Sequence, residues 1–158
     1  MSKKTGCKIV HVKNRLTELV RLPGGISREE AVVTAIKHVE SLRDDYVKLI
    51  PGEIAALEAI VGDGGEISAP DIERLLDRAV RLLSLSGTFG YSLLDAVVKC
   101  FCDLGMLMIK YDITSAAPLE VHLRAMRLVC PGSPALAEAE TKGILEQLAK
   151  IHTHFNAV

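Results

Sequence analysis

A chain of 158 residues with 49% hydrophobic residues is long enough for one globular domain with a sizeable core. Only 4% of its residues are aromatic and none is Trp, so the core must consist mainly of Leu, Ile, Val, Ala and Met, which favours packed helices. Nineteen basic and twenty acidic residues give a net charge of -1, which excludes an overall attraction to nucleic acid or to an anionic membrane.

Residues 1–22 form a basic segment with an apolar edge. Four apolar residues recur at helical spacing: Ile9, Val12, Leu16 and Leu19. This spacing predicts an amphipathic helix, although residues 8–13 also alternate as a strand would. The basic residues, set against the single acid Glu18, are Lys3, Lys4, Lys8, Lys13, Arg15 and Arg21. The segment either docks on its own bundle by the apolar edge or presents these six candidate residues to an acidic partner.

Residues 26–158 are expected to form a single helical domain after the break at Pro23-Gly24-Gly25. Ser27 and Glu30 have the spacing of a capping box, so a helix should begin there. Apolar residues at helical spacing continue from this helix to Val61, although Pro51 lies between. We expect a helix kinked at Pro51, with a break into two helices as the alternative.

Two further helices follow. Ser68 and Pro70 predict the start of a helix that runs to about Leu85. Residues 91–111 are apolar on nearly every side, so they should form the central helix, with Ser92 and Asp95 as its cap. Their length would suit a membrane span, but three charged residues four positions apart argue against one. These residues are Asp95, Lys99 and Asp103, which should form a ladder of ion pairs on the solvent edge.

Two shorter helices should complete the fold. One begins near Pro118 and buries Leu123 and Met126; the other should begin with Ser133 as its cap and Pro134 at its first position. No β-rich alternating stretch and no repeat of fixed period is visible. The sequence therefore predicts an all-α protein, an antiparallel bundle of about five helices with a basic N-terminal segment.

No catalytic motif is present. The chain has no GxSxG elbow, no glycine-rich phosphate loop after a strand and no HExxH pair. His38 is the candidate for a phosphotransfer histidine. Lys37 is the one neighbouring cation that would neutralise a phosphoryl group, whereas Glu40 would repel it. We expect a non-enzymatic protein with no catalytic residue and no cofactor, and keep a phosphotransfer relay as an alternative.

The metal candidates are equally weak. Cys7 and His11 share a helical face, whereas Cys100 with Cys102, and His152 with His154, point to nearly opposite sides. The cysteines, with Cys130, are few and irregularly spaced, as reduced core thiols are. We expect no metal site. A DNA-binding regulator that uses the basic segment is a further alternative, although no basic recognition helix is visible and we do not expect nucleic acid as the partner.

Several stretches in this order carry a resemblance to a known family. They are NRLTELVRLPGG, EEAVVTAIKHVESLRDDYVKLIPGEIAALEAIV, LSLSGTFGYSLLDAVVKCFCDLG and LEVHLRAMRLV. The chain resembles the CheE-type accessory proteins of alphaproteobacterial chemotaxis gene clusters. The resemblance covers most of the chain and rests on helix pattern and on a few loop residues. It implies a small non-catalytic protein that works beside a chemotaxis histidine kinase and its receiver proteins, and it carries no catalytic residues.

From these observations we expect an accessory or adaptor protein of chemotaxis (two-component) signalling that acts by protein–protein interaction. Its partner would be a histidine kinase, a receiver domain or a receptor, and a homodimer stays open. The first ten residues, MSKKTGCKIV, contain no apolar run followed by a small-residue cleavage site, so a cytoplasmic location is expected.

Overall fold

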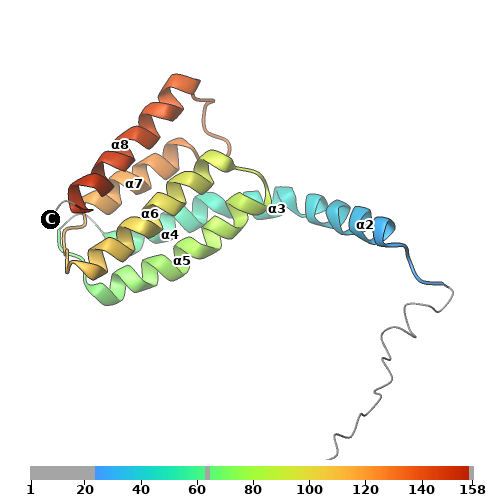
Figure 1. The fold of residues 1–158 in the computed structure, drawn as a ribbon, viewed down its shortest axis with the longest axis horizontal. Helices are drawn as coiled ribbons and strands as arrows, with labels where there is room; N and C mark the ends of the chain where they lie inside the picture. The colour runs from blue at the N-terminus through green and yellow to red at the C-terminus, as the bar shows by residue number, and fades with distance from the viewer. Residues whose placement is uncertain (1–23, 63–64, 157–158) are drawn as a thin grey trace, which may run out of the picture. The chain divides into compact units, whose positions relative to one another are not determined.

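The computed structural model describes residues 24–62 and 65–156. The chain divides into two units, residues 1–38 and 39–158, and each is considered by itself. The helices are α2 (Arg28–Ser41), α3 (Arg43–Val47), α4 (Ile50–Val61), α5 (Ala69–Thr88), α6 (Ser92–Lys110), α7 (Ala117–Leu128) and α8 (Glu138–Asn156), shown in Figure 1. The described residues contain no strand, only one isolated bridge between Glu66 and Ser115. The expected all-α helical bundle is confirmed.

Helix α2 begins as the capping box predicts. The Ser27 amide donates to Glu30 Oε2 and the Glu30 amide donates to Ser27 Oγ, each at 3.1 Å. The helix then presents its apolar side chains to solvent, because none of its residues is buried. Val32, Ile36 and Val39, which the sequence places on one face, are 50%, 62% and 44% exposed.

The helical stretch from Arg28 to Val61 is divided into separate helices and is not one helix kinked at Pro51. Helix α2 ends at Ser41, α3 ends at Val47, and α4 begins at Ile50. Pro51 lies in the first turn of α4, where its missing amide hydrogen has no intrahelical acceptor in any case. The proline therefore lies at the start of a helix. The run forms three helices, divided at Leu42 and at Lys48 and Leu49, so neither a kink at Pro51 nor a break there into two helices is found.

Helix α5 has the cap and the buried stripe expected from the sequence. The Asp71 amide donates to Ser68 Oγ at 3.3 Å, and Ser68 Oγ donates to Asp71 Oδ2 at 2.6 Å. Its buried residues are Ile72, Leu75, Ala79, Leu82 and Ser86. The helix is one turn longer than predicted, ending at Thr88 rather than near Leu85.

Helix α6 is the central helix, as predicted: it packs against α5, α7 and α8 (Figure 1). Its cap differs from the expectation. Tyr91 is the N-cap residue without a side-chain hydrogen bond, and Ser92 already belongs to the helix. The Asp95 carboxylate instead accepts a hydrogen bond from Ser86 Oγ of α5 at 3.2 Å. Asp95 thus links two helices rather than capping one.

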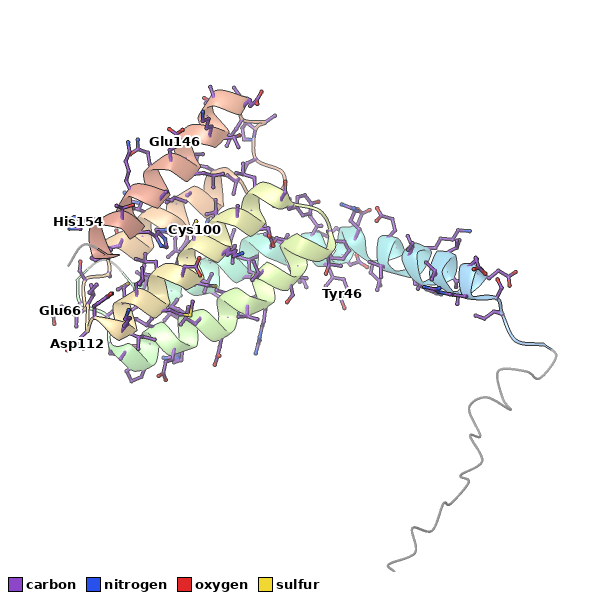
Figure 2. All side chains as sticks on the ribbon, viewed as in Figure 1. Tyr46, Glu66, Cys100, Asp112, Glu146 and His154 are labelled. Atoms are coloured by element: carbon purple, nitrogen blue, oxygen red, sulfur yellow. The ribbon has the colours of Figure 1, made fainter. Side chains whose placement is uncertain are left out.

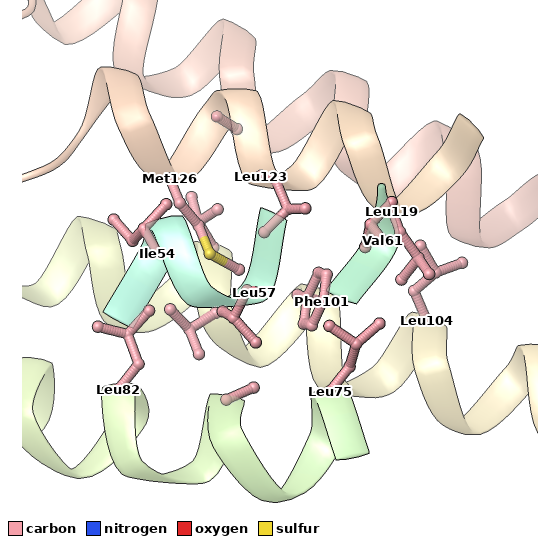
Figure 3. Close-up of a cluster of buried hydrophobic side chains, with 14 of the residues drawn as sticks. Ile54, Leu57, Val61, Leu75, Leu82, Phe101, Leu104, Leu119, Leu123 and Met126 are labelled. Carbon is pink, nitrogen blue, oxygen red and sulfur yellow. The ribbon is translucent and has the colours of Figure 1, made fainter. Parts of the chain in front are cut away.

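The core lies where α4, α5, α6 and α7 meet. Figure 3 shows Phe101 of α6 among aliphatic side chains from the three other helices. Phe101, Leu57, Leu75 and Met126 are each fully buried. Burying a side chain of this size contributes about 1.5–3 kcal/mol, so this cluster supplies much of the free energy that holds the bundle together.

Helix α7 buries Leu119, Leu123 and Met126 as predicted, but the start of α8 was wrongly predicted. The helix begins at Glu138, four residues after Pro134. The Ser133 hydroxyl donates to the Arg127 carbonyl at 3.0 Å, so Ser133 closes the end of α7. The Ala137 amide donates to Glu140 Oε2 at 2.8 Å, which replaces Ser133 as a cap for α8.

Helix α8 is the least buried part of the core. Leu148 is its one buried residue among those described, and Ile144, Ile151 and Phe155 are partly buried against the cluster. All four lie on the side of α8 that contacts the rest of the bundle. None of the described helices combines the length and the hydropathy that a membrane crossing requires, which agrees with the reading of residues 91–111.

Candidate functional site

An apolar groove lies between the α3 region and the C-terminal turns of α5. Its volume is about 510 Å³. The apolar residues lining it are Val39, Leu42, Tyr46, Leu49, Leu85 and Phe89. Three of these side chains are unusually open for their size: Leu42 is 46% exposed, Tyr46 42% and Leu49 53%. We call this surface the α3–α5 groove.

Aromatic and cationic contacts fix the shape of the groove. The rings of Tyr46, labelled in Figure 2, and Phe89 are stacked with centroids 6.0 Å apart. The Arg43 guanidinium lies 5.7 Å from the centroid of the Phe89 ring, and its Nη1 donates to the Phe89 carbonyl at 2.9 Å. Arg43 Nε also lies 2.6 Å from Glu40 Oε1. These contacts hold α3 against the end of α5.

The charged residues of the groove differ in whether they form an ion pair. The polar residues that line it are Glu53, Arg81, Ser84 and Thr88. The Glu53 carboxylate lies 3.0 Å from Arg78 Nε, although the two atoms are not aligned as a hydrogen bond. Arg81 is exposed and has neither a hydrogen bond nor an ion pair with any residue that the structure describes. The groove therefore combines an apolar floor with one uncompensated positive charge.

A second unusual site is a pair of imidazoles between α7 and α8. His122 is fully buried, and its ring centroid lies 5.6 Å from that of His152. Its Nδ1 lies 2.8 Å from the Pro118 carbonyl and must carry the proton that the carbonyl accepts. The Nε2 atoms of both histidines are buried without a hydrogen-bond partner. Burial lowers the pKa of His122 to about 4, so its ring is neutral at physiological pH.

The described cysteines are packing residues. Cys100 and Cys102 are half-buried, Cys130 is buried, and all three are free thiols. Burial raises the pKa of each thiol, so the unreactive protonated form predominates. Cys100 and Cys102 are two residues apart on α6 and therefore point to nearly opposite sides of it. No three metal-ligating side chains come together in residues 24–62 and 65–156.

The remaining described candidates of the sequence are not among the residues that line the groove. His38 is exposed on α2. Lys99 and Asp103 are exposed on α6 as predicted, but the described residues contain no ion pair joining them to each other or to Asp95. The expected charge ladder is therefore wrong, because Asp95 turns toward Ser86.

The six basic residues proposed to bind a partner lie outside the described residues, as do Cys7 and His11. Their part in binding stays a prediction.

Comparison with known proteins finds no matching family model, no similar curated protein and no similar solved structure.

Two features of the structure were not predicted from the sequence: the open α3–α5 groove and the buried position of His122. The apolar residues between positions 32 and 50 were expected to share one helical phase, but that phase does not reveal that Leu42, Tyr46 and Leu49 line an open groove. His122 stands three residues after Leu119 and four before Met126, a spacing that places it on the buried face of α7 and is its signal in the sequence. An apolar stripe shows that burial of one helix face is favourable. It does not show whether the residues that bury this face belong to the same chain.

Proposed function

We propose that the protein is a non-catalytic accessory protein of bacterial chemotaxis signalling that acts by binding another protein. The observation that carries the interaction role is the α3–α5 groove. Clustered apolar side chains of this size that stay half-exposed are typical of docking surfaces. The assignment to chemotaxis rests on the sequence resemblance described above.

The chemistry of the groove favours an amphipathic helical segment as the occupant. The groove offers Leu42, Leu49 and the stacked Tyr46 ring to apolar residues spaced three and four apart, as in other helix-in-groove complexes. Arg81, which is exposed and not paired with any acidic residue described in this chain, offers a guanidinium to a carboxylate on the bound helix. The partner is accordingly a histidine kinase, receiver or receptor that presents an apolar helix with an acidic residue at its edge.

The test is a binding measurement with a matched pair of substitutions. Leu49→Asp places a charge in the groove, whereas Leu128→Asp places one at an equally exposed position of α7 outside it; the two leucines are 53% and 54% exposed. With the purified kinase, receiver and receptor domains of the source cell, Leu49→Asp should weaken Kd at least about tenfold and Leu128→Asp less than about twofold.

Two results would contradict the proposal. If none of the three protein classes binds the unsubstituted chain, the signalling role fails. If both substitutions weaken binding equally, the partner docks elsewhere than in the groove. Far-ultraviolet circular dichroism of both variants provides the folding control.

A further inference from the structure

Helix α8 packs against α6 and α7 (Figure 1) without a polar link to either of them. No hydrogen bond or ion pair of the described residues joins α8 to another helix. The other helices of the core are tied together: Arg127 of α7 pairs with Glu58 of α4 at 2.6 Å, and Ser86 of α5 donates to Asp95 of α6. Apolar contacts and one pair of rings therefore hold α8 in place.

This pair of rings is the His122–His152 contact, which lies in the seam between α7 and α8. His152 follows Leu148 by four residues and precedes Phe155 by three, so it belongs to the face of α8 that turns toward the bundle. On the α6 side, the centroid of the His122 ring lies 6.4 Å from that of Phe101. The Nε2 atoms of both histidines are buried, and no described residue forms a hydrogen bond with them.

A second proton on His122 has no favourable place in this seam. Nδ1 already carries the proton that the Pro118 carbonyl accepts, so the added proton must go to Nε2. Helix α6 presents the uncharged Phe101 to the ring, and Glu58 of α4 is already in an ion pair. The described titratable group whose charge acts on the ring is His152, which disfavours a second positive charge. A buried charge without a partner is costly, so the protonated ring is stabilised where Nε2 reaches water.

Separation of α8 is the movement that exposes this Nε2 atom at the lowest cost. Helix α7 is fixed more firmly, because Leu119 and Met126 are fully buried and Arg127 is paired with α4. Removal of α8 uncovers Leu148 as its one buried residue among those described, and it breaks no hydrogen bond or ion pair between described helices. Most of the core between α4, α5, α6 and α7 stays intact.

We propose that the His122–His152 contact is an acid-sensitive latch, in which a proton on His122 releases α8 from α6 and α7 while the α4–α7 core stays folded. Burial lowers the pKa of His122 to about 4 in the closed seam, whereas a ring freed by the opening has its ordinary pKa of 6.5. Opening therefore binds a proton and becomes more favourable as the pH falls below 6.5 toward about 4. The inference does not depend on the proposed function, and its test needs no partner.

Hydrogen exchange of the full-length chain, corrected for the intrinsic pH dependence of amide exchange, measures this opening. Between pH 7 and pH 5 the protection of the α8 amides should fall at least about tenfold. Low concentrations of urea should hardly change the exchange of α8, because its release exposes little surface, but should accelerate the exchange of α5 and α6. If α8, α5 and α6 exchange at pH 5 with the same free energy and the same urea dependence, α8 unfolds together with the core and the latch is overturned.

Substitutions then identify the group that takes up the proton. His122→Leu and His122→Gln both remove the titrating ring, and His154→Leu is the control at an exposed position of α8. The effect of pH on α8 protection should fall below about twofold in the His122 variants and persist in His154→Leu. A tenfold effect that survives in a folded His122 variant would overturn the proposal. If neither variant folds, the urea dependence of exchange in the unsubstituted chain decides.

Discussion

His122 is an ionisable residue in the apolar core. Its ring is fully buried, lies in edge contact with Phe101 of α6, and faces His152 of α8. Burial is the main cause that lowers its pKa from 6.5 to about 4; the hydrogen bond with the Pro118 carbonyl opposes this shift and the neighbouring His152 adds to it. The folded protein therefore holds this imidazole in its neutral form.

A pH dependence of stability follows from this lowered pKa. Between pH 6.5 and about 4 the unfolded chain binds a proton at His122 that the folded chain does not, so the free energy of unfolding falls as the pH is lowered through this range. The loss should approach about 3 kcal/mol at pH 4. Above pH 6.5 this residue contributes no pH dependence. Urea unfolding at several pH values measures the slope.

The slope should largely disappear in His122→Leu. His154→Leu is the control, because His154 is exposed at the end of α8 (labelled in Figure 2) and its replacement should leave the slope unchanged. If His122→Leu and the unsubstituted chain lose stability in parallel, the imidazole is not buried as a neutral group.

Helices α5 and α6 are in close contact at Gly105. A Cβ placed on this residue would lie 2.8 Å from Leu76 Cδ2 and 3.3 Å from Leu76 Cγ. Glycine inside a helix ordinarily costs about 0.5–1 kcal/mol relative to alanine. Its presence in the middle of α6 is therefore explained by the neighbouring helix, and no periodicity in the sequence could reveal this contact.

Gly105→Ala should lower the free energy of unfolding by about 1 kcal/mol, since overpacking exceeds the gain in helix propensity. Gly143→Ala in α8, where a Cβ would meet nothing within 4 Å, should raise it by about 0.5–1 kcal/mol. Both values come from urea unfolding at pH 7.

Shortening Leu76 provides the decisive comparison. In a Leu76→Ala background the clash is absent, so adding Gly105→Ala should become neutral or stabilising. An equal loss in both backgrounds would show that the α5–α6 contact is not the cause.

Two parts of the chain are candidates for binding a partner, and they differ in chemical character. The α3–α5 groove binds by apolar burial with one cation, Arg81, whereas the basic segment would bind through six positive charges. Salt screens charges strongly and affects apolar burial little, so ionic strength separates the two modes.

We expect binding of a signalling partner to weaken less than about threefold between roughly 0.05 and 0.5 M NaCl, because the groove carries most of the contact. A variant in which Lys3, Lys4, Lys8 and Lys13 are all neutralised should bind with nearly the same Kd as the unsubstituted chain at each salt concentration. A steep loss of affinity with salt that vanishes in this variant would instead identify the basic segment as the docking site.

Local signals were sufficient to predict much of the fold. Ser27 with Glu30 and Ser68 with Asp71 cap their helices because the hydrogen bonds involved join residues only three positions apart. The central helix was also predicted, since residues apolar on most of their circumference need neighbours on several sides. The start of α8 was mispredicted because the Ser133 hydroxyl donates to the Arg127 carbonyl across the loop, whereas a helix cap would accept from an amide of the next helix.

The sequence by itself determined that the chain is helical, the caps at Ser27 and Ser68 and which residues share an apolar face, because these depend on spacing along the chain. Only the tertiary structure decided which apolar faces are covered: Ile54 and Leu57 are fully buried, whereas Leu42, Tyr46 and Leu49 stay open and line a groove. It also placed His122 inside the core and Asp95 beside Ser86. The physical reason is that burial depends on neighbours distant in the sequence, which periodicity within one helix does not specify.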